Sequence, residues 1–310
     1  MPELPEVETT VRGLRARVVD QTIAGFWCDW PLMIRYISVK EFTSKVKGAK
    51  IIGVRRRGKN IIIDLKGGLS IVAHMKMTGH FLVGKYARTG PNVRPWEPAL
   101  KVGPLNNPHN RFVHVVFELG SPTSHLAKLE LRGARLCLAF SDMRKFGKMA
   151  LHETKNLHTS KELGHLGPEL WEVKASDFAK IFRNKKGGKI KQALLDQTLL
   201  AGVGNIYSDE GLWFAGIHPL SLPGKIPENK LGELYRGLIN VTKASLKTGG
   251  DSMSDYRNVE GLGGKFQNFH KAYKQTGKKC VKKGCDGMMK RIVVGARSSH
   301  FCPKHQTLYV

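Results

Sequence analysis

The sequence predicts a multidomain α+β protein, and three successive residue patterns along the chain support this prediction. Residues 1–150 are mainly short β-branched segments that follow one amphipathic helix, as in a β-sandwich or barrel-like domain. In residues 151–268 the apolar period becomes helical, and residues 269–310 form a small basic module. At 310 residues the chain is long enough for about two domains of ordinary size.

The pattern of the first 150 residues supports the prediction of a strand-rich N-terminal domain. Pro5 can occupy a first helical turn, and apolar residues then repeat at helical spacing from Val7 to Val18. Residues 86–110 contain several prolines and no periodicity, so they predict a long surface loop. Strands are expected at residues 50–54, 60–65, 69–75, 111–119 and 134–140.

The middle of the chain predicts a connector followed by helices. Residues 151–189 end in the basic hinge RNKKGGK, and residues 251–268 are polar and glycine-rich, which is typical of a mobile loop. Asn205 is a plausible helix cap after the break AGVG. Helices are expected at residues 189–199, 205–216 and about 228–247.

Composition excludes several classes of protein. There are 51 Lys and Arg against 25 Asp and Glu, so the net charge of +26 favours a polyanionic partner such as nucleic acid. No apolar run approaches the roughly 20 residues of a membrane span, and the acidic, proline-broken start MPELPEVE is unlike a secretory signal.

The number of cysteines, five, is odd and therefore suits a disulfide framework poorly. Cys28 and Cys137 resemble buried free thiols, which indicates a reducing, cytoplasmic location.

The remaining cysteines predict a metal site near the C-terminus. Cys280 and Cys285 form one ligand pair, Cys302 and His305 form another, and the segment between them is long enough for a β-hairpin. Zn²⁺ accepts sulfur and nitrogen ligands in such an arrangement, so one structural zinc per chain is expected. His300 is the alternative fourth ligand, and the alternative to a metal site is three buried thiols beside a surface histidine.

Two further segments suggest chemistry. The turn AGVG and the helix start at Asn205 form a candidate phosphate site, with Lys191 just upstream, although many such turns connect helices without binding a ligand.

Pro2 permits removal of Met1, which exposes a secondary amine, and an α-amino group has a pKa of roughly 7.7–8.0. Glu3 and Glu6 beside it are candidates for proton transfer. The alternative is a helix start whose acids interact favourably with the helix dipole.

Taken together, the motifs resemble those of the formamidopyrimidine-DNA glycosylase family, which includes endonuclease VIII. The resemblance extends over nearly the whole chain, and the opening PELPEVE is similar to the formamidopyrimidine branch. The motifs occur in the family's order: MPELPEVETT, RRRGKNIIIDL, HMKMTGHF, DMRKFG, HLGPEL, LLDQTLLAGVGNIYSDEGLWFAGIHP and the C-terminal cysteine module.

The resemblance implies a fold and a partner. It implies an N-terminal catalytic β-sandwich at 1–150, a connector with a helix–two-turn–helix domain and a lesion-capping loop at 151–268, and a zinc finger at 269–310. Damaged double-stranded DNA would bind between the domains of a monomeric enzyme in the cytoplasm, associated with the nucleoid in a bacterium. That enzyme would excise oxidised purines from DNA and cut the strand by β- and δ-elimination.

The resemblance also assigns roles to residues. Pro2 matches the nucleophile, Glu3 the proton-donating acid, Glu6 a second carboxylate of the pocket, and Lys59 the catalytic lysine. Six further residues match DNA-contacting positions. Those that fill the space left by the flipped base are Met77, Arg144 and Phe146. Those that bind phosphates are His74, Asn205 and Arg297.

The chain departs from the family pattern in places. The first cysteine pair is normally CxxC and the last ligand normally a cysteine, whereas here Cys285 follows Cys280 by five positions and His305 ends the set. Residues 86–110 and 121–128 are longer than the family needs. Two alternatives remain: a related enzyme for oxidised pyrimidines, and a non-catalytic protein that binds damaged DNA on the same scaffold.

Overall fold

The computed structural model describes residues 1–88, 96–120, 133–253 and 255–310, and it divides the chain into two compact units. The first unit comprises Met1–Gly164 together with Gly249–Lys265, and the second comprises His165–Thr248 together with Phe266–Val310. The first unit therefore extends beyond the expected boundary at residue 150. It also contains most of the segment expected to be a loop of the helical domain.

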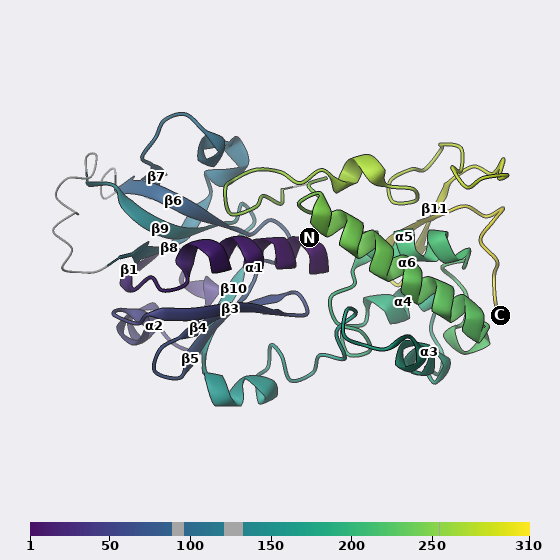
Figure 1. Cartoon of the computed structure of the whole chain (residues 1–310), viewed down its shortest axis with the longest axis horizontal. Coiled ribbons are helices and arrows are strands. Elements are labelled where there is room, and N and C mark those ends of the chain that lie inside the picture. The colour runs from purple at the N-terminus through teal and green to yellow at the C-terminus, as the bar shows by residue number, and fades with distance from the viewer. Residues whose placement is uncertain (89–95, 121–132, 254) are drawn as a thin grey trace. The chain divides into compact units, whose positions relative to one another are not determined.

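Two five-stranded sheets build the first unit (Figure 1). All pairings within them are antiparallel except that of β2 with β10. One sheet has the order β1 (Ile23–Cys28), β8 (Val113–Leu119), β9 (Arg135–Ser141), β6 (His80–Arg88) and β7 (Trp96–Pro98). The other has the order β2 (Ile34–Arg35), β10 (Lys148–Glu153), β5 (Leu69–His74), β4 (Asn60–Leu65) and β3 (Ile51–Arg57).

The predicted opening helix is α1 (Leu4–Val18), and it completes the core between the sheets. Val7 and Val11 of α1 are buried in the same cluster as Ile63 of β4 and Phe117 of β8. Figure 1 shows α1 alongside β3, where the Arg15 guanidinium donates hydrogen bonds to the Val54 carbonyl at 2.9 and 3.0 Å. A second helix, α2 (Val39–Val46), was not anticipated. The β-sandwich with an opening helix is therefore confirmed.

The expected surface loop at 86–110 is structured over its described residues, which corrects the prediction. It carries β7 and the 3₁₀ turns Pro104–Asn106 and Pro108–Asn110. Its Trp96 and Leu105 pack against the buried residues Tyr86 and Cys137 on the outer face of the β6–β9 sheet. Because that outer face is apolar, it needs a cover, and residues 96–110, called the insertion below, provide one. Residues 121–128, the other segment that is longer than the family needs, lie outside the described residues.

The two free thiols predicted to be buried differ in exposure. Cys137 is buried and Cys28 only half-buried. Burial raises the pKa of the Cys137 thiol to about 12 and that of Cys28 to about 11. Neither is a thiolate near neutral pH.

Helices dominate the second unit. The helix predicted at 228–247 is α6, whereas the helix predicted from 189 ends before 199. Gly204, in extended conformation, is the N-cap of α5, so the expectation that Asn205 caps this helix is wrong. None of the helices in the described ranges has the length and apolar character to cross a bilayer. The helices are α3 (Ala175–Arg183), α4 (Ile190–Leu195), α5 (Asn205–Ala215) and α6 (Glu228–Lys247).

The C-terminal module belongs to this second unit. Its hairpin consists of β11 (Lys290–Val294) and β12 (Arg297–Phe301). The chain end pairs with the segment after α5, since the His218 N–H donates to the Thr307 carbonyl and the Thr307 N–H to the Gly216 carbonyl, both at 2.8 Å. These backbone bonds attach the module to the helices.

Candidate active site and DNA-binding surface

The chain start is buried and its acids are held in place. Pro2, Glu3 and Glu6 are all buried. Glu3 is the N-cap of α1, and its N–H donates to Glu6 Oε2 at 2.8 Å. The other oxygen, Glu6 Oε1, accepts the Asp251 N–H at 2.8 Å. The carboxylate of Glu6 is therefore held between the first turn of α1 and the 249–265 segment.

Lys59 lies on the turn between β3 and β4 and is only 6% exposed. Arg56 connects this turn to α1, since Nη1 donates to the Gly58 carbonyl at 3.1 Å and Nε to Glu8 Oε2 at 3.2 Å. Both contacts are largely shielded from water, because the Arg56 side chain is 7% exposed. The lysine that the sequence singled out is thus attached to the helix that carries Glu3 and Glu6.

His74 ends β5 among lysines. The Lys76 N–H donates to His74 Nδ1 at 2.9 Å. Burial, and then the charges of Lys76, Lys59 and Lys148, lower the pKa of His74 to about 3. The imidazole is therefore neutral and carries its proton on Nε2. A neutral N–H donor surrounded by ammonium groups is well suited to a phosphate.

Met77, Arg144 and Phe146, called the wedge cluster below, lie together on two exposed turns. Arg144 Nη1 is 3.1 Å from the Met77 sulfur, and the guanidinium carbon is 4.6 Å from the centre of the Phe146 ring. Met77 is 39% and Phe146 47% exposed, so neither belongs to the core. Lys76 and Lys145, one in each turn, both have φ of +57°, a conformation uncommon outside glycine. Both turns therefore expose apolar side chains at some conformational cost.

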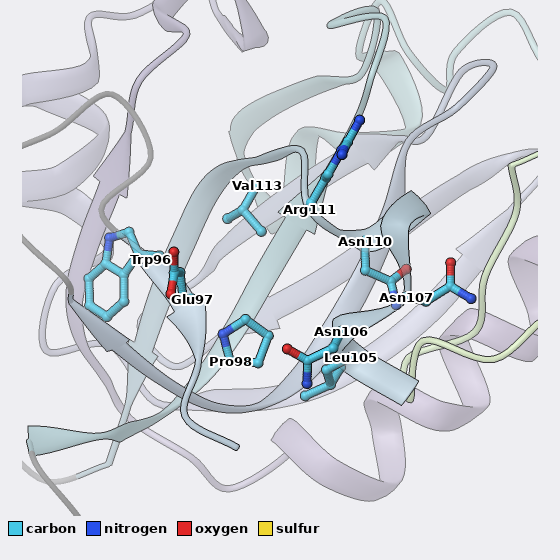
Figure 2. A pocket seen from close by; sticks show the side chains of 9 residues that line it. All are labelled: Trp96, Glu97, Pro98, Leu105, Asn106, Asn107, Asn110, Arg111 and Val113. Atoms are coloured by element: carbon cyan, nitrogen blue, oxygen red, sulfur yellow. The ribbon is translucent and has the colours of Figure 1, made fainter. Parts of the chain in front are cut away.

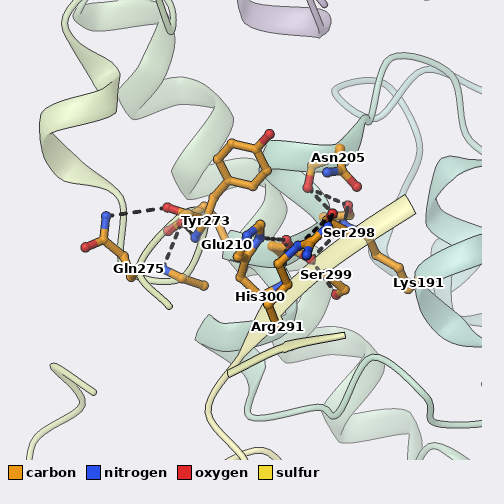
Figure 3. Close-up of polar contacts among 12 residues, drawn as sticks. Lys191, Asn205, Glu210, Tyr273, Gln275, Arg291, Ser298, Ser299 and His300 are labelled. Carbon is orange, nitrogen blue, oxygen red and sulfur yellow. Dashed lines mark hydrogen bonds and ion pairs between the residues drawn. The ribbon is translucent and has the colours of Figure 1, made fainter. Parts of the chain in front are cut away.

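Lys191 has a different role from the one expected. Its side chain is fully buried, and Nζ donates to Asp209 Oδ1 at 2.6 Å, Ser208 Oγ at 2.7 Å and the Asn205 carbonyl at 2.9 Å (Figure 3). An ammonium enclosed in this way has no access to a DNA phosphate, so the expected direct contact is wrong. Lys191 instead neutralises a buried carboxylate, as buried charges require.

Asp209 and Glu210, which sequence reasoning missed, join α5 to the C-terminal module. Asp209 accepts from Ser299 Oγ at 2.7 Å and from the His300 N–H at 2.9 Å. Glu210 accepts backbone N–H groups of residues 271–273 at 2.8 to 3.2 Å. Burial raises the pKa of Glu210. The signal in the sequence was the pair of adjacent acids within the otherwise apolar helix NIYSDEGLWFA.

Two residues predicted to bind phosphates, Asn205 and Arg297, lie at the starts of a helix and a strand of the second unit. Asn205 begins α5, and its Oδ1 is buried without a hydrogen-bond partner in the part of the chain that the structure describes. Arg297 is exposed at the start of β12. Their contacts with DNA remain predictions.

Cys280, Cys285, Cys302 and His305 form a compact metal-ligand cluster. Their ligand atoms all lie within 4.8 Å of one another, with Cys285 Sγ 3.7 Å from Cys302 Sγ and Cys280 Sγ 3.3 Å from His305 Nδ1. A tetrahedral ion with bonds of about 2.3 Å to sulfur separates its sulfurs by about 3.8 Å. The donor set and its spacing fit such an ion.

The structure favours His305 over His300 as the fourth ligand. His300 Nδ1 lies 3.0 Å from Asp209 Oδ2, away from the cluster. His305 Nε2 lies 3.0 Å from the Trp213 carbonyl, so Nε2–H donates there and Nδ1 is left as the ligand atom. A Cβ on Gly287 would lie 2.6 Å from Cys302 Sγ, so glycine is needed where the backbone passes the cluster.

Comparisons with known proteins agree with this geometry. Residues 1–149 match the Formamidopyrimidine-DNA glycosylase N-terminal domain, and residues 166–257 match the Formamidopyrimidine-DNA glycosylase H2TH domain. The chain is 34% identical over 306 residues to the formamidopyrimidine-DNA glycosylase of Solibacter usitatus, covering 99% of each chain. It is 36% identical over 308 residues to that of Cereibacter sphaeroides, covering 99% of this chain and all of the relative.

Solved structures show the same likeness. Lactococcus lactis Fpg in complex with abasic-site DNA has a TM-score of 0.79 at 29% identity, covering 98% of this chain and 99% of that one. The wild-type Lactococcus lactis protein with N7-benzyl-Fapy-dG DNA has a TM-score of 0.78 at 30% identity, covering 97% and 98%. Fold, site and likeness define a DNA glycosylase of base-excision repair. The chain belongs to the formamidopyrimidine-DNA glycosylase family.

Proposed function

We propose that this protein removes oxidised purines, such as 8-oxoguanine and formamidopyrimidines, from duplex DNA and then cuts the strand at the resulting abasic site. It acts as a monomer in the cytoplasm. The observation that carries the proposal is the buried start of the chain, where Pro2 precedes two buried acids, Glu3 and Glu6, and the Glu3 backbone N–H donates to the Glu6 carboxylate at 2.8 Å. The solved relatives bound to N7-benzyl-Fapy-dG DNA and to abasic-site DNA support the choice of substrate.

The chemistry follows from the Pro2 amine once Met1 has been removed. The nitrogen attacks C1′ of the damaged nucleotide, the glycosidic bond breaks, and the base leaves with a proton from Glu3. The C1′–O4′ bond of the sugar then opens, with a proton passed to O4′, and the adduct becomes a charged iminium, because the proline nitrogen is a secondary amine. The iminium makes the C2′ proton acidic, so its removal expels the 3′ phosphate, and a second elimination expels the 5′ phosphate. Lys59 and Glu3 serve these proton transfers.

Borohydride trapping tests this proposal. With an 8-oxoguanine duplex, reduction of the iminium should yield a covalent protein–DNA adduct on the N-terminal peptide. Pro2→Gly should lose most of the adduct and of the strand cleavage, yet keep duplex binding close to that of the wild type. An adduct on Lys59, or full activity in protein that retains Met1, would contradict the mechanism.

A panel of lesion duplexes separates the remaining alternatives. Faster excision of oxidised pyrimidines than of 8-oxoguanine would support the endonuclease VIII-like alternative. Tight binding to damaged duplexes without any cleavage, in protein with a processed N-terminus, would support a non-catalytic protein.

The ion of the ligand cluster is proposed to be zinc. Cys280, Cys285, Cys302 and His305 supply the sulfur and nitrogen ligands that Zn²⁺ favours in structural sites. The ion would stabilise the small C-terminal module, which buries few apolar residues of its own. Metal analysis of the purified protein should find about one zinc per chain. A folded, metal-free module would contradict this assignment.

A further inference from the structure

The insertion of residues 96–110 ends at a buried side chain, Asn110. A pocket of about 330 Å³ runs beneath the insertion, with Trp96 and Asn110 among the residues that line it (Figure 2). In Figure 2, Asn110 lies toward the end of the pocket opposite Trp96. Asn110 is only 2% exposed, unlike Asn106, which is exposed in the same insertion. A buried amide requires hydrogen-bond partners.

The partners of Asn110 join three separate segments. Its Nδ2 donates to the Pro104 carbonyl at 2.9 Å and to the Gly261 carbonyl at 3.3 Å, while Oδ1 lies 3.0 Å from His80 Nε2. Carbonyls only accept, so the amide nitrogen must face them and Oδ1 must accept from His80. One side chain thus connects the insertion, the 249–265 segment and the start of β6.

From His80 the contacts continue to the wedge cluster. His80 Nδ1 lies 3.1 Å from the Thr78 carbonyl, and the Thr78 hydroxyl donates to Asp142 Oδ1. Asp142 also accepts the Arg144 N–H at 3.2 Å and the Gly147 N–H at 2.7 Å. Asp142 and Thr78 therefore connect the two turns that carry Met77, Arg144 and Phe146.

Gly261 forms the other end of this series of contacts. Its φ of +85° suits glycine, and a Cβ there would lie 2.4 Å from Asn110 Nδ2. The surrounding turn is attached to the core, because Val259 is buried and its carbonyl accepts the Val83 N–H at 2.8 Å. Glycine thus permits both the turn and the close approach of Asn110.

The 249–265 segment is also attached at the candidate active site. The Asp251 N–H donates to Glu6 Oε1 at 2.8 Å, and the Tyr256 hydroxyl donates to the Glu6 carbonyl at 3.0 Å. The segment therefore contacts both sites, Glu6 through Asp251 and Tyr256 and Asn110 through Gly261.

We propose that Asn110 is a positioning residue for base removal, which holds the 249–265 segment in register with both Glu6 and the turns of the wedge cluster. This inference rests on the proposed function. Through Asn110, the insertion connects the two turns of the wedge cluster to the 249–265 segment, which contacts Glu6. Base removal requires this link, whereas cleavage at an abasic site that is already formed does not, because no base has to be held.

The decisive variant is Asn110→Asp, which has nearly the same shape and keeps an acceptor for His80 but loses both donors. The matched control is Asn106→Asp, because Asn106 Nδ2 donates to the Leu100 carbonyl, within the insertion, at 2.8 Å. Under single-turnover conditions, Asn110→Asp should excise 8-oxoguanine about tenfold more slowly and cut a preformed abasic site within about twofold of the wild-type rate. Asn106→Asp should match the wild type in both assays.

A second pair of variants tests the link from the other side. Gly261→Ala places a methyl group against Asn110 and should give the same selective loss of base excision. Gly68→Ala is its control, because Gly68 has a φ of +83° but nothing within 4 Å of an added Cβ. It imposes similar backbone strain without the contact, so it should excise the base at close to the wild-type rate.

Hydrogen exchange of the full chain provides a readout independent of activity. Residues 249–265 should exchange faster in Asn110→Asp than in Asn106→Asp, with the sheets unchanged. If the wild-type protein neither excised 8-oxoguanine nor cut abasic sites, the proposed function would be refuted. The hydrogen-exchange result would then still test whether Asn110 holds the 249–265 segment in place. With an active wild type, normal excision by Asn110→Asp, or equal loss of excision and cleavage, would overturn the inference.

Discussion

At the scale of single residues, His74 shows how surroundings determine a protonation state. The folded-state pKa of about 3 lies below the ordinary value of 6.5, first because of burial and then because of Lys76, Lys59 and Lys148. Between these two values the unfolded chain binds more protons at this position than the folded protein does. The free energy of unfolding therefore falls as the pH drops below about 6.5.

His74→Gln should weaken this pH dependence, because glutamine keeps an N–H donor but does not titrate. The contribution of His74 is at most about 1.4 kcal/mol per pH unit. Denaturant unfolding at about pH 7.5 and about pH 5 should show a smaller loss of stability in the variant than in the wild type. The control is His158→Gln, at an exposed histidine. Equal pH dependence in wild type and His74→Gln would show that His74 is not held neutral.

At the scale of elements, the two turns that carry the wedge cluster lead to a prediction about base removal. Phe146 is 47% exposed beneath the Arg144 guanidinium, so it is available to enter the DNA stack. Unstacking a base costs a few kcal/mol, and side chains that fill the gap offset part of that cost. Phe146→Ala should therefore excise the base about 10- to 100-fold more slowly while general duplex binding changes little.

Single-turnover excision and equilibrium binding, measured on the same duplex, check this expectation. Met143→Ala is a suitable control, because Met143 is also exposed in this turn, at 50%, but belongs to none of the wedge contacts. An unchanged excision rate in Phe146→Ala would mean that the ring has no role in opening the duplex.

The contact between α5 and the C-terminal module leads to a second prediction at this scale. Asp209 and Lys191 are both fully buried and lie 2.6 Å apart, so removing one charge leaves the other uncompensated. Asp209→Asn should lower the free energy of unfolding by about 3 kcal/mol or more. Asp177→Asn, which breaks an exposed pair with Lys180 at 3.8 Å, should change it by less than about 1 kcal/mol.

Denaturant unfolding of the metal-loaded full chain measures both variants. If Asp209→Asn were as stable as Asp177→Asn, neither the buried pair with Lys191 nor the contacts of Asp209 with β12 would contribute to stability. A loss of stability with retained metal would separate the ion pair from the metal site, because the four ligands are unchanged.

At the scale of the whole molecule, the net charge of +26 predicts binding to DNA that depends strongly on salt. The logarithm of the binding constant should fall with the logarithm of salt concentration, with a slope of about −0.9 per phosphate neutralised. Arg297→Ala should reduce the magnitude of that slope by about 1 and weaken damaged and undamaged duplexes alike. Arg183→Ala is the control, because Arg183 is paired with Glu228 at 2.7 Å.

A salt titration with both kinds of duplex decides this prediction. A flat response would mean that the excess positive charge does not contact DNA. A loss confined to the damaged duplex would mean that Arg297 reads the lesion rather than the backbone.

Many elements could be predicted from local pattern. Helices α1 and α6 have clear helical periods, and β4 is a short continuous run of isoleucines. Strands β6 and β10 were missed because their sequences, HFLVGKYAR and KMALHE, lack a run of β-branched residues. Sheet neighbours at both edges stabilise them, and such neighbours are not visible in sequence.

The sequence by itself determined the three cysteine ligands of the metal cluster and the acids that follow Pro2, because close spacing along the backbone already brings such groups together. Only the tertiary structure favours His305 over His300 as the fourth metal ligand. It also shows that Lys191 is paired with the buried Asp209 and so does not bind a phosphate. Finally, only the tertiary structure brings Asn110 into contact with Gly261. The last two positions are 151 residues apart in the chain. Contacts of that kind depend on how whole faces pack, and neither local spacing nor periodicity encodes them.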